Sequence, residues 1–169
     1  FATGMGSTDI AAAMALGETW FKVPPTIRVE MTGSLRPFVG AKDLILALIG
    51  RIGVSGALYK ALEFGGPLTS ALSVEGRMTM ANMAIEAGGK VGLFPADDKT
   101  LDYCRTAGRH GDEYLCADPG AHYERVVEID ASGMEPLVAC PHLPENVRPV
   151  GDLRGVTVDQ AVIGSCTNG

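Results

Sequence analysis

A carboxylate and an amide lie one helical turn apart in VEGRMTMANMAIEAGGK, residues 74–90, a segment whose apolar spacing predicts a helix. At about 100° per residue, this helix places four polar residues on one narrow stripe between apolar residues: Glu75, Thr79, Asn82 and Glu86. If the stripe is buried, Asn82 and Glu86 line a polar cavity that holds a ligand or a water, because a buried carboxylate is costly without a partner. If it is exposed, it is an ordinary solvated helix face. The pattern alone favours neither interpretation.

The second candidate is Cys166 in AVIGSCTNG, residues 161–169, where an apolar run leads into small polar residues and glycine. Ligands bind where strands of an α/β sheet end in loops. Three roles stay open for the thiol: a ligand to a metal or iron–sulfur centre, a nucleophile beside a base, or a buried structural cysteine. No base is assigned, because no histidine stands in a recognisable relation to Cys166: His110, His122 and His142.

Composition narrows the classes of function. The chain has 169 residues and a net charge of −6, and its 14 Lys and Arg residues are spread thinly, whereas a nucleic-acid surface needs clustered cations. The remaining cysteines, Cys104, Cys116 and Cys140, form no CxxC pair and no compact zinc motif. No apolar stretch approaches the roughly 20 residues of a membrane helix, and no signal peptide is recognisable. We therefore expect a cytoplasmic protein that acts on a small molecule or with a protein partner.

Hydrophobic patterning predicts helices and strands in alternation along the chain. Helices are expected over 8–16, 41–52, 74–90 and 97–109, strands over 26–32, 124–129 and 159–164, and a proline-rich connection over 140–153. Residues 57–64 fit either period. Such an alternation indicates a layered α/β architecture, in which helices cover a sheet.

The segment IGSCTNG, residues 163–169, resembles the iron–sulfur signature of the aconitase family. Three further segments resemble the same family in the same order: FATGMGSTDIAAAMALGETWFKVPPTIRVEMTGSL, LSVEGRMTMANMAIEAGG and DPGAHYERVVEID. The resemblance covers nearly the whole chain, and it implies a hydro-lyase that moves a hydroxyl between adjacent carbons by dehydration and rehydration. Within the family, the likeness is to the two-subunit enzymes. It implies isomerisation of 2-isopropylmalate and 3-isopropylmalate in leucine biosynthesis, or the homoaconitate reaction of lysine biosynthesis.

The resemblance also implies a cofactor and roles for individual residues. The family binds a [4Fe-4S] cluster through three cysteines and leaves one iron open as a Lewis acid. Cys166 matches the first of these three metal ligands. Asn82 and Glu86 match an Asn and a Glu near the cluster. Glu86 would hydrogen-bond or exchange a proton with the oxygen at the open iron, and Asn82 would help to fix the surroundings of the cluster.

Parts of the family's site have no match in the sequence. The other two cluster cysteines and an Asp-Ser-His segment are missing, so we expect an internal fragment that is inactive and lacks the cluster by itself. The family's serine general base comes from a swivelling domain. This implies a small subunit as the partner in a heterodimer, with a 2-hydroxy di- or tricarboxylate as the substrate.

By the same resemblance, the chain consists of three-layer α/β/α units. We expect the end of a first domain over 1–25, a second domain over 26–127 and the start of a third over 128–169, which ends at the cluster-ligand loop. Two alternatives lie outside this class: an enzyme with a cysteine nucleophile and no metal, and an RNA-binding module. The acidic charge balance argues against the second.

Overall fold

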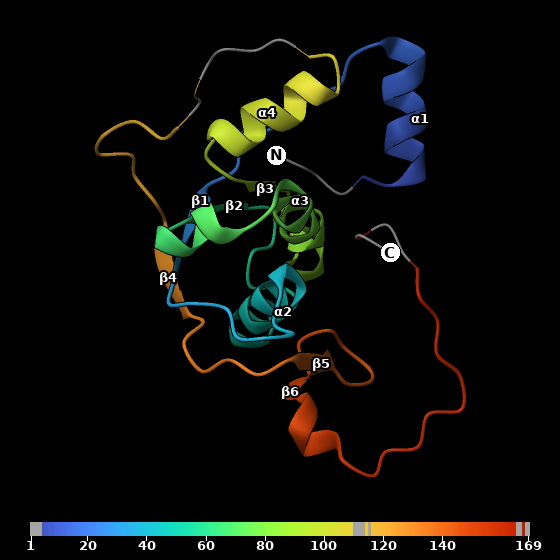
Figure 1. Ribbon diagram of the computed structural model, residues 1–169. Coiled ribbons are helices and arrows are strands. Elements are labelled where there is room, and N and C mark those ends of the chain that lie inside the picture. Colours follow the sequence, from blue (N-terminus) through green and yellow to red (C-terminus); the bar gives the residue numbers. More distant parts are fainter. Residues whose placement is uncertain (1–4, 110–113, 115, 165–166, 168–169) are drawn as a thin grey trace.

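The computed structural model describes residues 5–109, 114, 116–164 and 167, and its centre is a parallel sheet of four strands (Figure 1). The strands lie in the order β3-β2-β1-β4 and are β1 (Thr26–Thr32), β2 (Ala61–Gly65), β3 (Val91–Leu93) and β4 (Arg125–Asp130). All neighbours are parallel, and parallel neighbours need a crossover connection, which helices supply here. The predicted α/β architecture is confirmed.

Two helices, α2 (Ala41–Ile52) and α3 (Val74–Asn82), pack side by side against one face of the sheet. A short 3-10 helix, η2 (Met83–Ala87), continues α3. Alternate side chains of a strand point to opposite faces, and β1 turns its fully buried residues toward the helices: Ile27, Val29 and Met31. The helices meet them with apolar residues of their own, among them Leu44, Ile45, Leu48, Ile49 and Met80. This core fixes the position of α2 relative to α3.

The opposite face of the sheet carries a polar network. The Arg28 Nε lies 2.9 Å from Glu30 Oε2, and its Nη1 lies 2.7 Å from Glu63 Oε1. Tyr123 donates its hydroxyl to the same Glu63 oxygen at 2.8 Å, which favours the protonated phenol and raises the pKa of Tyr123. These groups satisfy one another, so the network is a structural feature of this face.

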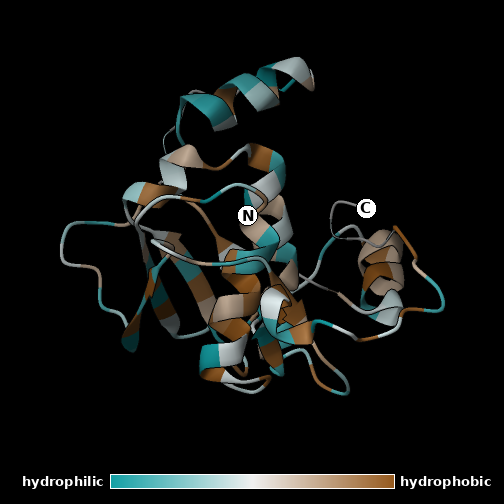
Figure 2. Ribbon diagram, turned by 60° about the horizontal axis from the view of Figure 1, so that its bottom comes forward, coloured by the Kyte–Doolittle hydropathy of each residue, from teal (hydrophilic) through white to brown (hydrophobic). Residues whose placement is uncertain are grey.

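The other elements surround this body. The helix α1 (Ser7–Leu16) stands apart from the sheet (Figures 1 and 2) and buries none of its residues. After the sheet, β5 (Leu137–Ala139) and β6 (Val147–Pro149) form an antiparallel hairpin. The described residues also contain three peripheral helices: η1 (Pro67–Ala71), α4 (Asp98–Thr106) and η3 (Val150–Leu153). No helix within the described ranges is long and apolar enough to cross a membrane.

The structure corrects two predicted elements. Residues 159–164 form no strand, and Val162 and Ile163 are 82% and 97% exposed. A strand needs a neighbour whose backbone groups are free to pair, and no described strand lies beside this run. The connection predicted over 140–153 contains β6 and η3, because the chain turns back after β5 and pairs with it.

Two further segments differ in extent from their predictions. The helix predicted over 74–90 changes to 3-10 form at Met83 and ends before Gly88, whose φ of 79° is the left-handed conformation common after helices. Of the ambiguous residues 57–64, the part from Ala61 onward belongs to β2.

Of the two predicted domain boundaries, one falls at the start of a strand and the other falls inside a strand. Thr26 is the first residue of β1, whereas Glu128 lies inside β4, opposite Glu30 of β1. The division into 1–25, 26–127 and 128–169 stays a prediction.

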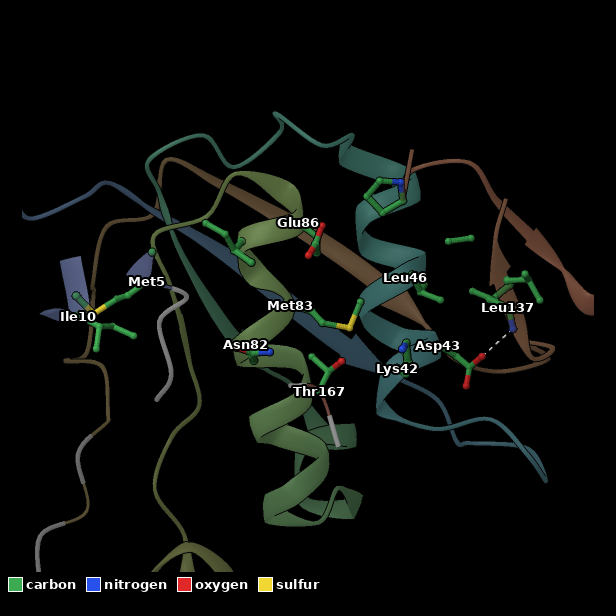
Figure 3. A pocket seen from close by; sticks show the side chains of 15 residues that line it. Met5, Ile10, Lys42, Asp43, Leu46, Asn82, Met83, Glu86, Leu137 and Thr167 are labelled. Atoms are coloured by element: carbon green, nitrogen blue, oxygen red, sulfur yellow. Dashed lines mark hydrogen bonds between the residues drawn. The ribbon is translucent and has the colours of Figure 1, made fainter. Parts of the chain in front are cut away.

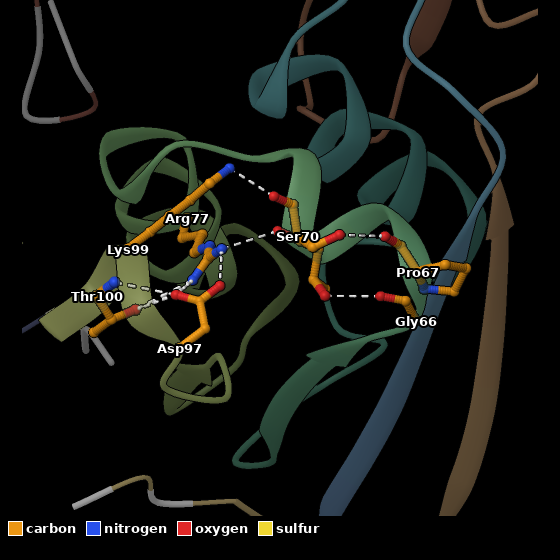
Figure 4. Close-up of polar contacts among 8 residues, drawn as sticks. Gly66, Pro67, Ser70, Arg77, Asp97, Lys99 and Thr100 are labelled. Carbon is orange, nitrogen blue, oxygen red and sulfur yellow. Dashed lines mark hydrogen bonds and ion pairs between the residues drawn. The ribbon is translucent and has the colours of Figure 1, made fainter. Parts of the chain in front are cut away.

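An ion pair between the buried Arg77 and the partly exposed Asp97 joins α3 to α4 (Figure 4). Arg77 is 5% exposed, and its Nη1 and Nη2 bond both carboxylate oxygens of Asp97 at 2.8 and 2.6 Å. The same guanidinium donates to the Thr69 carbonyl of η1 at 3.1 Å. Asp97 also caps α4 by accepting the Thr100 amide at 3.1 Å. Its hydrogen bond with Arg77 holds the pKa of the Asp97 carboxyl well below its usual range.

Asp97→Asn should lower the free energy of unfolding by about 2 kcal/mol, because it leaves the buried Arg77 charge without its partly exposed counterion. Asparagine can still cap α4, so the lost free energy of unfolding measures the ion pair and not the cap. Urea unfolding of the chain measures the change. The control is Asp102→Asn, which removes the exposed pair with Arg105 on the same helix and should cost less than about 0.5 kcal/mol. Equal losses in the two variants would contradict the assignment.

The same pair predicts a pH dependence with a definite sign. The folded pKa of Asp97 is lowered from its ordinary value of 3.8, so its stabilisation is complete above that value and is lost as the pH falls toward the folded pKa. The stability gap between the wild type and Asp97→Asn should therefore be narrower at pH 3 than at pH 7. A gap that widens in acid would have the wrong sign.

Candidate functional site

A cavity of about 1130 Å³ lies between α2 and the helical segment formed by α3 and η2 (Figure 3). The segment before α1 and the strand β5 complete its walls. Four parts of the chain contribute most of the lining: Lys42, Asp43 and Leu46 from α2, Asn82, Met83 and Glu86 from α3 and η2, Leu137, Val138, Ala139 and Pro144 from the hairpin, and Thr167. The cavity therefore brings together segments that are far apart in the sequence.

Asn82 and Glu86, the two predicted site residues of the helix, both line this cavity. Asn82 is the last residue of α3, and Glu86 lies one turn later in η2. Asn82 is half-buried and Glu86 is exposed. The carboxylate therefore faces an open cavity, and of the two interpretations left open by the sequence, the exposed one holds for Glu86.

The other two residues of the predicted stripe, Glu75 and Thr79, lie away from the cavity wall. Thr79 is buried and donates its hydroxyl to the Glu75 carbonyl at 3.0 Å, and neither residue lines the cavity. Two of the apolar residues beside the stripe, Met78 and Ile85, are 45% and 48% exposed, whereas the others are buried: Met80, Ala81, Met83, Ala84 and Ala87. The change from α to 3-10 form after Asn82 explains part of this, since it rotates the later residues away from the ideal helical stripe.

Cys166, the predicted metal ligand, lies outside the described residues. Its neighbour in the sequence, Thr167, is described and lines the same cavity as Asn82 and Glu86. Figure 3 shows Thr167 between the helical wall with Asn82 and the α2 wall with Lys42. The last described residue of the chain thus reaches the wall that carries the other two predicted residues.

Lys42 is a cavity residue that sequence reasoning missed. It is exposed in the first turn of α2 and faces the cavity from the wall opposite Asn82. Its neighbour Asp43 is already engaged, because its carboxylate accepts the amides of Gly40 and Leu137, both at 2.7 Å. The cavity wall therefore presents the amide of Asn82, the carboxylate of Glu86 and the ammonium group of Lys42. These groups suit a small anionic ligand with a hydroxyl group.

The described residues alone do not form a cluster site. Among them, no three His, Cys, Asp or Glu side chains come together as metal ligands. Cys104, Cys116 and Cys140 do not line the cavity, and neither do His122 and His142, while His110 lies outside the described residues. A cluster at this cavity would need ligands from outside the described residues, and a nucleophile there would find no described histidine on the cavity wall.

Comparison with known proteins identifies the relatives of the chain. The model of the aconitase family (aconitate hydratase) matches residues 1–154. Proteins named 3-isopropylmalate dehydratase large subunit are 74% identical in Nitratidesulfovibrio vulgaris strain Miyazaki F, 59% in Moorella thermoacetica and 54% in Elusimicrobium minutum. Each match covers the whole of this chain but only 40%, 40% and 41% of the relative. The resemblance seen in the sequence is confirmed, and the chain belongs to the aconitase family.

Proposed function

We propose that the chain is part of the large subunit of a 3-isopropylmalate dehydratase, which interconverts 2-isopropylmalate and 3-isopropylmalate by dehydration and rehydration in leucine biosynthesis. One observation carries the proposal: Asn82 and Glu86 line one cavity together with Thr167, the residue that follows Cys166. The names of relatives that are 54–74% identical support the choice of substrate. Homoaconitase of lysine biosynthesis is the alternative within the family.

Three residues of the chain have different roles in this reaction: Glu86, Asn82 and Cys166. Glu86 exchanges a proton with the substrate hydroxyl as it leaves and returns, which its position on the cavity wall supports. Asn82 hydrogen-bonds groups at the same wall and so fixes their orientation. Cys166 is one of three thiolate ligands, and the other two come from parts of the subunit outside these 169 residues. When bound, the [4Fe-4S] cluster supplies a Lewis acid for the substrate's hydroxyl and carboxylate.

The partner is a small subunit that carries the swivelling domain and supplies the serine general base. The relatives are named large subunits, which supports a two-subunit enzyme. A net charge of −6 without clustered cations supports a protein that binds neither nucleic acid nor an anionic membrane surface. We propose that the enzyme acts in the cytoplasm.

The substrate assignment is tested with a full-length large subunit that carries this sequence, reconstituted anaerobically with its small subunit. Formation of the unsaturated intermediate is followed by ultraviolet absorbance, with 2-isopropylmalate and homocitrate as rival substrates. We expect kcat/KM for 2-isopropylmalate to exceed that for homocitrate by at least about tenfold, equivalent to 1.4 kcal/mol. The opposite preference would assign the chain to homoaconitase, and inactivity with both substrates would overturn the proposal.

A further inference from the structure

Two carboxylates hold the β5-β6 hairpin against α2 at opposite ends of the helix. Near its start, Asp43 accepts the Leu137 amide of β5 at 2.7 Å. Just after its end, Glu145 Oε2 accepts the Val54 amide at 2.7 Å. Hydrogen bonds to charged acceptors are stronger than neutral ones. The hairpin is therefore attached to α2 at two points that are separated by nearly the whole helix.

The backbone of α2 is shaped for this contact. A Cβ added at Gly50 would lie 3.1 Å from Val147 Cβ, so glycine allows β6 to approach the helix closely. At Gly53 a Cβ would lie 3.0 Å from Glu145 Oε2, and the φ of 79° there also favours glycine. A two-stranded hairpin has marginal stability by itself. Its position consequently depends on what it contacts on α2.

The hairpin forms an apolar wall of the candidate site. Four of its residues line the cavity: Leu137, Val138, Ala139 and Pro144. The opposite wall, formed by α3 and η2, carries Asn82 and Glu86 and makes neither of the two carboxylate bonds. Loss of either bond therefore removes no contact of Glu86, the group proposed to transfer the proton.

We propose that Asp43 and Glu145 are positioning residues that clamp the β5-β6 hairpin to α2 and so hold the apolar wall of the substrate cavity. Loss of a clamp residue loosens the wall and weakens substrate binding. Proton transfer at Glu86 continues at its normal rate once the substrate is bound. This inference rests on the proposed function for its kinetic consequence but not for its structural one.

The structural consequence is tested by hydrogen exchange on the full-length large subunit assembled with its small subunit. Glu145→Ala should speed exchange of the Val54 amide about tenfold, and Asp43→Ala should do the same at Leu137, because each amide loses its acceptor and opens more readily. Glu145→Gln keeps an acceptor oxygen and should restore slow exchange. The control is Glu135→Ala, an exposed carboxylate next to β5, which should change neither amide. Unchanged exchange in both alanine variants would overturn the clamp.

The kinetic consequence is tested with 2-isopropylmalate on the same variants. Glu145→Ala should raise KM about tenfold with kcat changed less than about twofold, and Glu145→Gln should return KM to the wild-type range. A merely structural role would instead lower the amount of active enzyme, which reduces kcat and leaves KM unchanged. That result would refute the positioning role. If the wild type is inactive while exchange responds as expected, the proposed function fails and the clamp stands.

Discussion

Replacing Cys166 by alanine in a full-length large subunit that carries this sequence is expected to abolish the brown cluster absorbance and the hydro-lyase activity together. A cluster held by three cysteines loses a third of its protein ligands in this variant, and thiolate ligation has no substitute in an alanine methyl group. The measurement is the visible absorbance spectrum of the anaerobically purified protein, with its iron and acid-labile sulfide content and its activity with the small subunit.

The matched control for this experiment is Cys104→Ala. Cys104 is a half-buried cysteine on α4, and it does not line the cavity with Asn82 and Glu86. This variant should keep both the absorbance and the activity. A Cys166→Ala protein with a normal cluster spectrum would refute the ligand assignment, and a metal-free active enzyme that loses activity on alkylation of Cys166 would favour the nucleophile instead.

Glu86→Gln should lower kcat by between about 10²- and 10⁴-fold, the range that a positioned general acid or base contributes. Glutamine has nearly the same size and keeps a hydrogen-bonding oxygen, but it cannot take up or release the proton. Glu86 is exposed at the cavity wall, so the substitution should hardly affect folding. The measurement is kcat with 2-isopropylmalate at saturating concentration, alongside the cluster spectrum, which should be unchanged.

Glu75→Gln provides the control on the same helical segment. Glu75 is also exposed and belongs to the polar stripe of the helix, but it does not line the cavity. We expect its kcat to stay within about twofold of the wild type. If Glu86→Gln retains full activity, or if both variants lose it to the same extent, proton transfer does not depend on Glu86.

The elements with a strong local pattern were predictable from the sequence. The strand Thr26–Thr32 and the helix Ala41–Ile52 have the bounds that alternation and helical spacing indicate. The sequence offers Asp97 or Asp98 as the cap of α4, and Asp97 is the one whose carboxylate accepts the Thr100 amide of the first turn. In each of these cases, residues close in the sequence determine the structure.

The features that depend on distant segments were not predictable in this way. Lys42 belongs to the cavity because α2 packs beside η2, and no pattern within α2 indicates that. The second strand of the hairpin, β6, lies in the segment 140–153, whose prolines favour a loop, although it pairs with β5 through Val147 and its neighbours. The run over 159–164 has the apolar character of a strand but no described neighbour to pair with. Pairing partners, rather than local composition, decided both results.

The position of α2 has a consequence for the size of the cavity. One side of α2 packs into the core of the sheet with Ile45 and Leu48. The hairpin is bonded near both ends of the helix, by Asp43 at its start and by Glu145 of the hairpin just after its end. The cavity therefore has two walls above a shared core, α2 with its hairpin on one side and α3 with η2 on the other. Because core packing sets the spacing of the two helices, conservative changes deep in the core should alter which ligands fit, without touching any residue of the cavity wall.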